Sequence, residues 1–199
     1  MEIRTPRRRI GRLEREQQIL DAAVAVLAER GLQNASMDAV AERVGVTKPV
    51  LYTHFGSKDG LLLACIARER AELLQVTTAA AAAADGPEDM LRRGTTAFFD
   101  HLERHEPAWA LLYSESTVAG EALEGIRAQQ TDFIATLLAA QSPGADPQQL
   151  AGWAQVIVGA CERLAIWRAQ VRDVSSEQAT GYLMDLVWHG LATSPPVRA

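Results

Sequence analysis

The chain has 199 residues, of which 48% are hydrophobic and 23% are charged, and this balance excludes an intrinsically disordered protein. No apolar run reaches the roughly 20 residues that span a bilayer. The charged segment MEIRTPRRRIGRLER at the N-terminus has no apolar core behind it, so a signal peptide is not expected. The two cysteines, Cys65 and Cys161, lie far apart and predict neither a disulfide framework nor a zinc motif. We therefore expect a cytoplasmic protein of one large domain or two small ones.

Charge is divided unevenly along the chain. Residues 1–58 carry a net charge of +3, whereas residues 59–199 carry a net charge of −8. Six arginines fall within the first 15 residues. A basic N-terminal part on an acidic protein can present one end of the molecule to a polyanion such as DNA. For residues 1–11 the alternative is a solvated tail without a partner.

Apolar residues at helical spacing predict helices along the whole chain, and no stretch alternates as a strand would. In the N-terminal part, a first helix around 19–27 is expected to end at Gly31, and a short helix follows at 37–44. Gly45 ends this short helix, and Thr47-Lys48-Pro49 opens another one. Three short helices are therefore predicted before residue 58.

Longer helices are predicted in the rest of the chain. Ser57 caps a helix that runs into the alanine stretch 79–84, and Asp85-Gly86-Pro87 separates it from the next one. Further helices are expected at about 88–105, from Pro107 onward, and at about 121–141, 147–172 and 176–192. The predicted fold class is all-α, with about nine helices.

The segment 36–58, SMDAVAERVGVTKPVLYTHFGSK, has the pattern of a helix-turn-helix. Gly45 allows the positive φ of a tight turn, and the small Ala41 lets the two helices cross closely. The apolar seam between the helices is expected to consist of Val40, Val44, Val46, Leu51 and Phe55. The remaining side chains of the second helix face outward without an apolar partner. A helical hairpin with no role in DNA binding is the alternative.

Residues 19–66, and above all GVTKPVLYTHFGSKDGLL at 45–62, resemble the DNA-binding domain of the tetracycline-repressor (TetR) family of bacterial regulators. The resemblance implies an all-helical homodimer with a three-helix DNA-binding domain and basic arm at 1–60. A helical ligand-binding and dimerisation domain at 61–199 would follow. The implied function is a ligand-responsive repressor that a small molecule releases from a pseudo-palindromic double-stranded operator. The alternative is a DNA-binding or adaptor protein of the same fold without an effector.

The resemblance also implies which residues contact DNA. Lys48, Pro49 and Val50 occupy the positions that meet base edges, whereas Tyr52, His54 and Lys58 occupy those that hold phosphates. Lysine can read guanine, and tyrosine and imidazole can donate to phosphate oxygens. Asp38 departs from this pattern, because an acidic residue lies where DNA should run; it is expected to stabilise the first turn of its helix. The complete predicted set is Ser36, Thr47, Lys48, Pro49, Val50, Tyr52, Thr53, His54 and Lys58.

The last two predicted helices carry more apolar surface than one partner helix can cover. The alternative interpretations are the interior of a single core and a dimer interface, and the large tryptophans favour the interface. The predicted interface residues are Trp153, Ile157, Leu164, Trp167, Leu183, Leu186 and Val187.

Large side chains between about 88 and 170 predict an apolar pocket for an effector, with plain core packing as the alternative. Arg127 is the only cation between residues 105 and 162, so we expect a mostly apolar, neutral or cationic effector rather than a polyanion. The predicted ligand-binding residues are Phe98, Leu102, Trp109, Tyr113, Thr117, Gln130, Phe133 and Leu137.

Other candidate sites are weaker. His101 and His105 are four residues apart, but their sequence is HLERH rather than HExxH, and the spacing implies no third ligand. We expect solvated surface histidines, with no metal and no cofactor. Ser114, Glu115 and Ser116 lack a strand-turn-helix elbow, and there is no glycine-rich phosphate loop, so an enzyme is not expected.

Overall fold

A computed structural model describes residues 11–112, 117–171 and 173–193. Within these residues the chain forms nine helices and no strand, so the prediction of an all-α fold with about nine helices is confirmed. None of the helices in the described ranges combines the length and apolarity needed to cross a bilayer. The helices are α1 (Arg12–Asn34), α2 (Met37–Val44), α3 (Lys48–Phe55), α4 (Lys58–Ala82), α5 (Pro87–Arg104), α6 (Glu106–Leu112), α7 (Thr117–Gln141), α8 (Pro147–Val171) and α9 (Ser176–Thr193).

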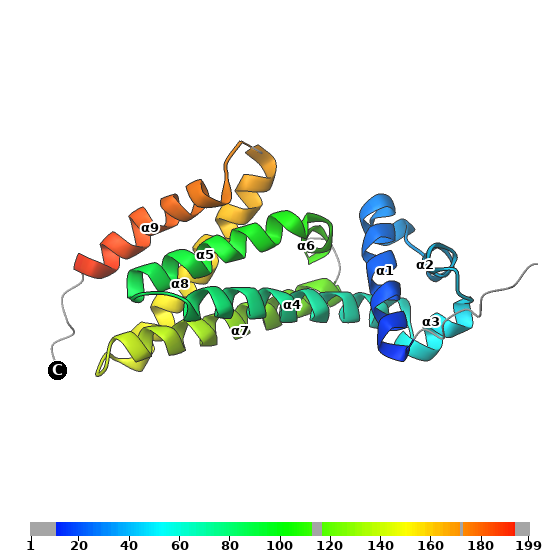
Figure 1. Cartoon of the computed structure of the whole chain (residues 1–199), viewed down its shortest axis with the longest axis horizontal. Helices are drawn as coiled ribbons and strands as arrows, with labels where there is room; N and C mark the ends of the chain where they lie inside the picture. Colours follow the sequence, from blue (N-terminus) through cyan, green and yellow to red (C-terminus); the bar gives the residue numbers. More distant parts are fainter. Residues whose placement is uncertain (1–10, 113–116, 172, 194–199) are drawn as a thin grey trace, which may run out of the picture.

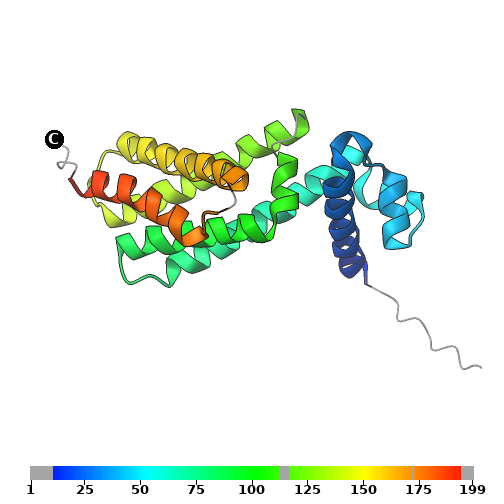
Figure 2. The same ribbon diagram turned by 90° about the horizontal axis from the view of Figure 1, so that it is seen from above.

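The molecule has a small head and a larger body, joined by α4 (Figures 1 and 2). Helices α1, α2 and α3 form the head, and α5 to α9 form the body. Helix α4 starts beside α3 and α1, then continues between α5 and α7. Helix α6 lies at the end of the body that faces the head and packs against α1. The head therefore contacts the body through α4 and α6.

Local caps fix the boundaries of the short helices. Ser36 Oγ accepts a hydrogen bond from the Ala39 amide at 3.2 Å and thereby caps α2. Gly45 adopts φ 73° and ends the same helix, because the left-handed conformation costs glycine little. Gly31, with φ 71°, interrupts α1 as predicted, but the chain adds one more turn up to Asn34.

One apolar cluster holds the head together and extends into the body. It includes the predicted seam of the helix-turn-helix: Val40 and Leu51 are buried, and Val44, Val46 and Phe55 pack against them. Trp109 of α6 joins the same cluster. From α4 it receives Leu61, Leu62, Cys65, Ile66 and Leu73, and from α7 it receives Leu123 and Ile126. The first half of α4 is thus part of the core of the head.

The corner between α3 and α4 depends on Gly60. Ser57 Oγ caps α4 by accepting a hydrogen bond from the Gly60 amide at 2.9 Å. A Cβ atom added at Gly60 would overlap the carbonyl oxygen of Phe55, which is a backbone atom and cannot rotate away. Gly60 therefore allows α4 to approach the end of α3.

We expect Gly60→Ala to lower the free energy of unfolding by about 1–3 kcal/mol, since the backbone at this corner must shift to admit the methyl group. Gly152→Ala is the matched control, because nothing lies within 4 Å of a Cβ at this exposed position in α8. The control should raise the free energy of unfolding by about 0.5–1 kcal/mol. Urea unfolding monitored by circular dichroism measures both, and equal effects of the two substitutions would contradict the role given to Gly60.

Candidate functional site

Helix α3 is the exposed element of the helix-turn-helix. Leu51 and Phe55 anchor it on the core, so the opposite face of the helix points outward. The side chains of Lys48, Pro49, Tyr52 and Thr53 are exposed. Val50 and His54 are half-buried at the edges of the same face. An exposed helix of this length, seated on two others, has the dimensions that enter a DNA major groove.

Lys48 pairs with Asp38 across the turn between α2 and α3. The Lys48 Nζ atom lies 2.8 Å from Asp38 Oδ2. The hydrogen bond to Asp38 raises the pKa of Lys48, so this side chain keeps its positive charge. The sequence predicted Asp38 in the first turn of α2, where it lies, but did not predict its ion pair with Lys48. A base contact of Lys48 would require this exposed ion pair to open.

The other predicted DNA-contacting residues have structural roles as well. Lys58 donates a hydrogen bond to the Leu32 carbonyl at 2.6 Å and so satisfies the end of α1 from the start of α4. Thr53 donates to the carbonyl of Pro49 at 2.9 Å. Thr47 is the N-cap residue of α3, yet its side chain makes no capping hydrogen bond. The predicted basic arm falls almost entirely on residues 1–10, outside the described ranges.

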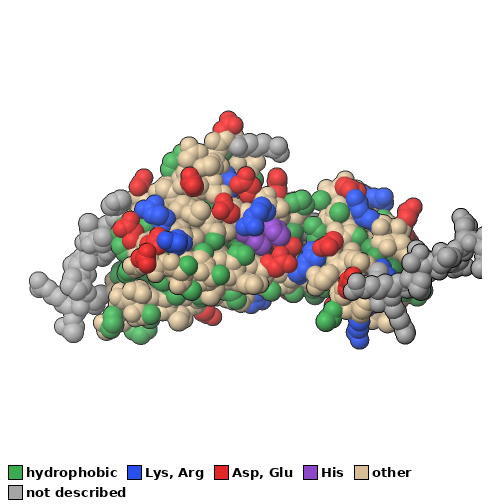
Figure 3. Space-filling view, viewed as in Figure 1, with side chains coloured by type: hydrophobic (Ala, Val, Ile, Leu, Met, Phe, Trp, Pro, Cys, Tyr) green, Lys and Arg blue, Asp and Glu red, His purple; other side chains and the backbone are tan. Residues whose placement is uncertain are grey.

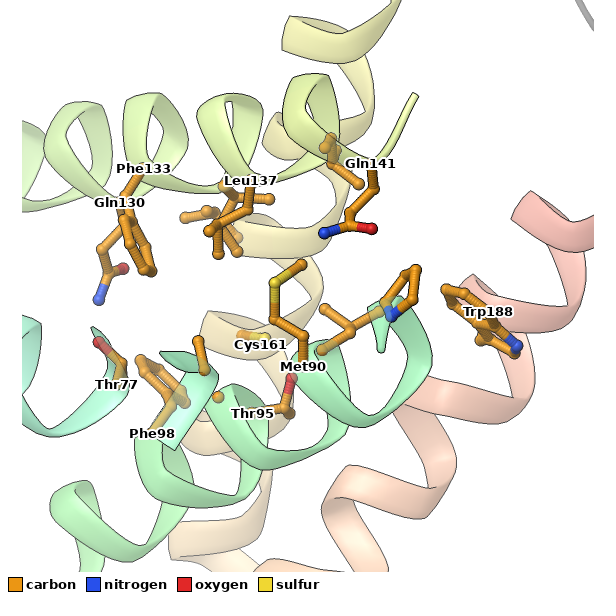
Figure 4. Close-up of a pocket in the computed structure, with 17 residues that line it drawn as sticks. Thr77, Met90, Thr95, Phe98, Gln130, Phe133, Leu137, Gln141, Cys161 and Trp188 are labelled. Atoms are coloured by element: carbon orange, nitrogen blue, oxygen red, sulfur yellow. The ribbon is translucent and has the colours of Figure 1, made fainter. Parts of the chain in front are cut away.

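A second candidate site is an apolar cavity within the body, between α4, α5, α7 and α8 (Figure 4). Its volume is about 90 Å³. The lining residues include no charged side chain, and burial raises the pKa of the Cys161 thiol in its wall to about 12. Gln130 and Gln141 supply amides at the two ends of the row that α7 contributes (Figure 4). The cavity is suited to an apolar molecule with few hydrogen bonds.

The predicted pocket residues divide into two groups. Phe98, Gln130, Phe133 and Leu137 line the cavity. Leu102 and Trp109 do not; they pack against the apolar cluster shared with the head, and they border a separate groove beside α8. Of the remaining two, Tyr113 lies outside the described residues, and Thr117 is the first residue of α7 with a side chain that is likewise not described.

Helices α8 and α9 lie side by side on the surface of the body and carry the third candidate site (Figure 2). An apolar groove runs between them. Leu186 is 81% exposed, and Val156, Trp167 and Tyr182 are also exposed large hydrophobic side chains. Contiguous apolar surface of this kind marks a site of association.

Two of the predicted interface residues do not belong to the exposed surface. Ile157 and Leu183 are each only 1% exposed and form the core between α8 and α9 within one chain. Both nevertheless line the groove, together with Trp153, Leu164, Trp167, Leu186 and Val187. The role of these seven residues in a dimer interface stays a prediction.

The prediction of solvated surface histidines is wrong for His101. This residue is 1% exposed, and its ring stacks on that of His105 with the centroids 4.2 Å apart. Burial lowers the pKa of His101 to about 4, so the imidazole is neutral. Beside the pair lies Glu69 of α4, which is 4% exposed and whose pKa is raised by burial. Glu69 occupies the inward face of α4 three residues after Ile66 and four before Leu73, and this spacing could have revealed it.

Two family models match the chain. Residues 19–65 match the bacterial regulatory proteins of the tetR family, and residues 87–190 match the tetracyclin repressor-like C-terminal domain. The transcriptional activator FasR of Mycolicibacterium smegmatis is 30% identical over 197 residues, covering 96% of this chain and 89% of FasR.

Solved structures agree with these matches. The crystal structure of a TetR-like transcriptional regulator from Rhodococcus sp. RHA1 has 33% sequence identity and a TM-score of 0.75, covering 94% of this chain and 100% of that one. FadR from Bacillus subtilis, crystallised in complex with stearoyl-CoA, shares the fold with a TM-score of 0.72 at 16% identity, covering 86% of this chain and 96% of FadR. The chain belongs to the TetR family of bacterial transcriptional regulators.

Proposed function

We propose that this chain is a homodimeric operator-binding repressor that a small, mostly apolar molecule releases from DNA. The observation that carries the proposal is the course of α4, which belongs to the core of the head and also lines the apolar cavity of the body. A regulator of this kind acts in the cytoplasm and carries out no catalysis. Its chemistry consists of two binding equilibria that are coupled through one helix.

In the proposed complex, the residues that contact DNA lie on the exposed face of the head. Lys48 leaves Asp38 to donate to guanine, and Pro49 and Val50 supply apolar contact to neighbouring bases. Tyr52 and His54 donate to phosphates on either side. Ser36, Thr47, Thr53 and Lys58 add contacts at the ends of α2, α3 and α4. The cap at Ser36 and the bidentate pair of Arg43 with Glu29, at 2.6 and 2.7 Å, support a rigid presentation of α3.

We expect Lys48→Ala to weaken binding to the preferred operator by about 10–100-fold and to relax the preference at one base position, because it removes a base-reading donor. Tyr52→Phe is the control, since it removes a phosphate contact and should weaken binding to all sequences nearly equally. Selection from a random DNA library, followed by sequencing, gives the base preferences of each protein. A preference that Lys48→Ala leaves unchanged would refute the base-reading role.

In the proposed dimer, two chains pair through the groove between α8 and α9. A pseudo-palindromic operator requires two heads related by a two-fold axis. Pairing of the exposed faces of α8 and α9 removes Val156, Trp167 and Leu186 from water, which supplies the apolar centre that stable interfaces have. The net charge of −8 on residues 59–199 does not oppose this contact, because large hydrophobic side chains dominate the groove.

We expect Leu186→Glu to raise the dimer dissociation constant at least about 100-fold, because pairing would bury an unpaired carboxylate. The monomer should remain folded, since Leu186 is already in water within one chain. Leu13→Glu is the matched control: Leu13 is 78% exposed, but it lies on α1, away from the groove. Sedimentation velocity at micromolar concentration measures the change, and a monomeric wild type would exclude this dimer.

The proposed effector binds in the apolar cavity. Phe98, Phe133 and Leu137 surround an apolar body, and Gln130 can bind a neutral polar group. Arg127, the cation of this region that sequence reasoning singled out, is held by Glu162 at 2.7 Å and by Glu124, so it is not available to a phosphate. FadR of Bacillus subtilis, which shares the fold, was crystallised in complex with stearoyl-CoA, a ligand with a long apolar chain, and this supports an apolar chain as the recognised part.

The small size of the cavity couples effector binding to DNA binding. A volume of about 90 Å³ is smaller than the roughly 300–1,000 Å³ of typical ligand pockets, so an effector has to move helices apart. Helix α4 lines the cavity at Thr77 and Ala81. Displacement of α4 changes the spacing of the two heads in the dimer. The effector releases DNA because it binds the widened body more tightly than the closed one.

Gly94 lines the cavity, and nothing lies within 4 Å of the position that a Cβ atom would occupy there. Gly94→Leu fills this space, so it should keep operator binding but require at least about 10-fold more effector for release. Gly120→Leu at an exposed position of α7 is the control, because nothing lies within 4 Å of a Cβ there. Fluorescence anisotropy of labelled operator measures release by fatty alcohols, fatty acids, acyl-CoA and free CoA of graded chain length. Release by acyl-CoA alone, with no effect of fatty alcohols, would refute the neutral or cationic effector.

Activation of transcription is the second candidate, and the name of FasR as an activator favours it. Repression requires only that the bound dimer exclude polymerase from a promoter, whereas activation requires a productive contact with polymerase. In vitro transcription from the operator-containing promoter separates the two. Loss of transcripts on adding the protein supports repression, and a gain supports activation.

A further inference from the structure

The strongest feature outside the DNA-binding face, the cavity and the groove is a cluster of two buried side chains and one half-buried side chain at the end of the body that faces the head. It consists of Glu69 on α4 together with His101 and His105 on the last turn and C-cap of α5. In the space-filling view, histidine side chains form a patch on the body toward the head (Figure 3). Operator binding and the proposed effector use none of these three residues.

The three side chains bring potential ligand atoms close together. Glu69 Oε2 lies 2.8 Å from His105 Nδ1 and 3.7 Å from His101 Nε2, and the three atoms all lie within 4.8 Å of one another. Zinc bonds of about 2.0–2.2 Å at tetrahedral angles place ligand atoms about 3.3–3.5 Å apart. The observed separations lie on both sides of this value. The two imidazole rings are stacked at an interplanar angle of 16°, so one of them has to turn about its side-chain torsions before both nitrogens point to one ion.

One of the three ligand atoms is buried and lacks a hydrogen bond. Among the described residues, His101 Nε2 has no hydrogen-bond partner, whereas Glu69 Oε2 has its short contact with His105 Nδ1. A buried imidazole nitrogen without a partner is costly, and native proteins rarely leave such an atom unsatisfied. A positively charged ion bound beside Glu69 would satisfy this nitrogen, because an unprotonated imidazole nitrogen offers a lone pair.

We propose that Glu69, His101 and His105 bind one divalent first-row transition-metal ion, with Zn²⁺ as the ion that suits this ligand set. Two imidazoles and one carboxylate are a recurrent metal-binding combination, and imidazole favours zinc, copper, iron and nickel over magnesium or calcium. Three protein ligands leave a further coordination position for water or for Glu72, whose Oε2 atom is 3.9 Å from His105 Nδ1 on the exposed side.

The surrounding charges permit a cation. Arg68 lies 3.5 Å from Glu69 Oε1, the oxygen that does not face the histidines, and its own charge is held by Asp21 at 2.6 Å. Trp109 packs edge-on to His101 at a centroid distance of 6.4 Å and shields the site from water on the side of α6. Such an apolar wall strengthens the coordination of an ion by protein ligands.

The test uses the untagged, full-length protein after treatment with a chelator. Titration with Zn²⁺ in competition with a chromophoric chelator should give one ion per chain, and a hundredfold excess over the dissociation constant should raise Tm by about 5–10 °C. Glu69→Gln and His105→Gln should each weaken binding at least about 10-fold. The matched control is His54→Gln, which removes a histidine of the head and should leave the Zn²⁺ affinity unchanged.

Visible absorption of the Co²⁺-loaded protein reports on the ligands directly. The wild type should give the intense ligand-field bands of a low-coordinate nitrogen and oxygen site, and Glu69→Gln should lose them. If Glu69→Gln fails to fold, His105→Gln carries the test, because its ring is partly exposed. Zinc binding that is unchanged in the cluster variants, or no binding by the wild type, overturns the proposal. Neither result depends on whether the protein binds an operator.

Discussion

Everything in this molecule depends on the burial of the first half of α4 in the core of the head. Leu61, Leu62 and Ile66 pack with residues of α1 and α2, so the start of α4 cannot move without the head. The second half of the same helix lies between α5 and α7. One helix therefore belongs to two cores. Because a helix bends little, a displacement of its second half is transmitted to the head.

The corner before α4 explains why this coupling is tight. Gly60 brings the helix against the backbone of Phe55, and Lys58 binds the end of α1 through the Leu32 carbonyl. These two contacts join α4 to α3 and to α1. Trp109 of α6 enters the same cluster from the body. The head is thus attached to the body at two places, and the orientation of α3 depends on both.

The head was predictable from sequence because the residues that specify it act over short distances. A cap at Ser36, a positive φ at Gly45 and the buried Leu51 all lie within sixteen residues of one another. The body was less predictable, because periodicity finds an apolar face but not the element that covers it. Ile157 and Leu186 belong to similar apolar patterns, yet one is buried within the chain and the other is exposed.

The same limit applies to sites that are built from two helices. The spacing of His101 and His105 places them on one face of α5, but only the packing of α4 against α5 brings Glu69 to them. Leu102 and Trp109 were expected in the cavity because of their size, and the rotation of α5 and the position of α6 direct them toward the head instead. Tertiary pairing of helices, rather than local propensity, decides each of these cases.

The ion pair of Lys48 with Asp38 has a consequence for how the protein searches DNA. In the proposed complex, Lys48 has a partner within its own chain whenever the base in front of it is wrong. The carboxylate also repels nearby phosphates, so the residence time on unrelated sequence becomes shorter. At a guanine the lysine exchanges one acceptor for another and loses little. A regulator built in this way gives up some total affinity, and in return it spends less time on the large excess of competing genomic sites.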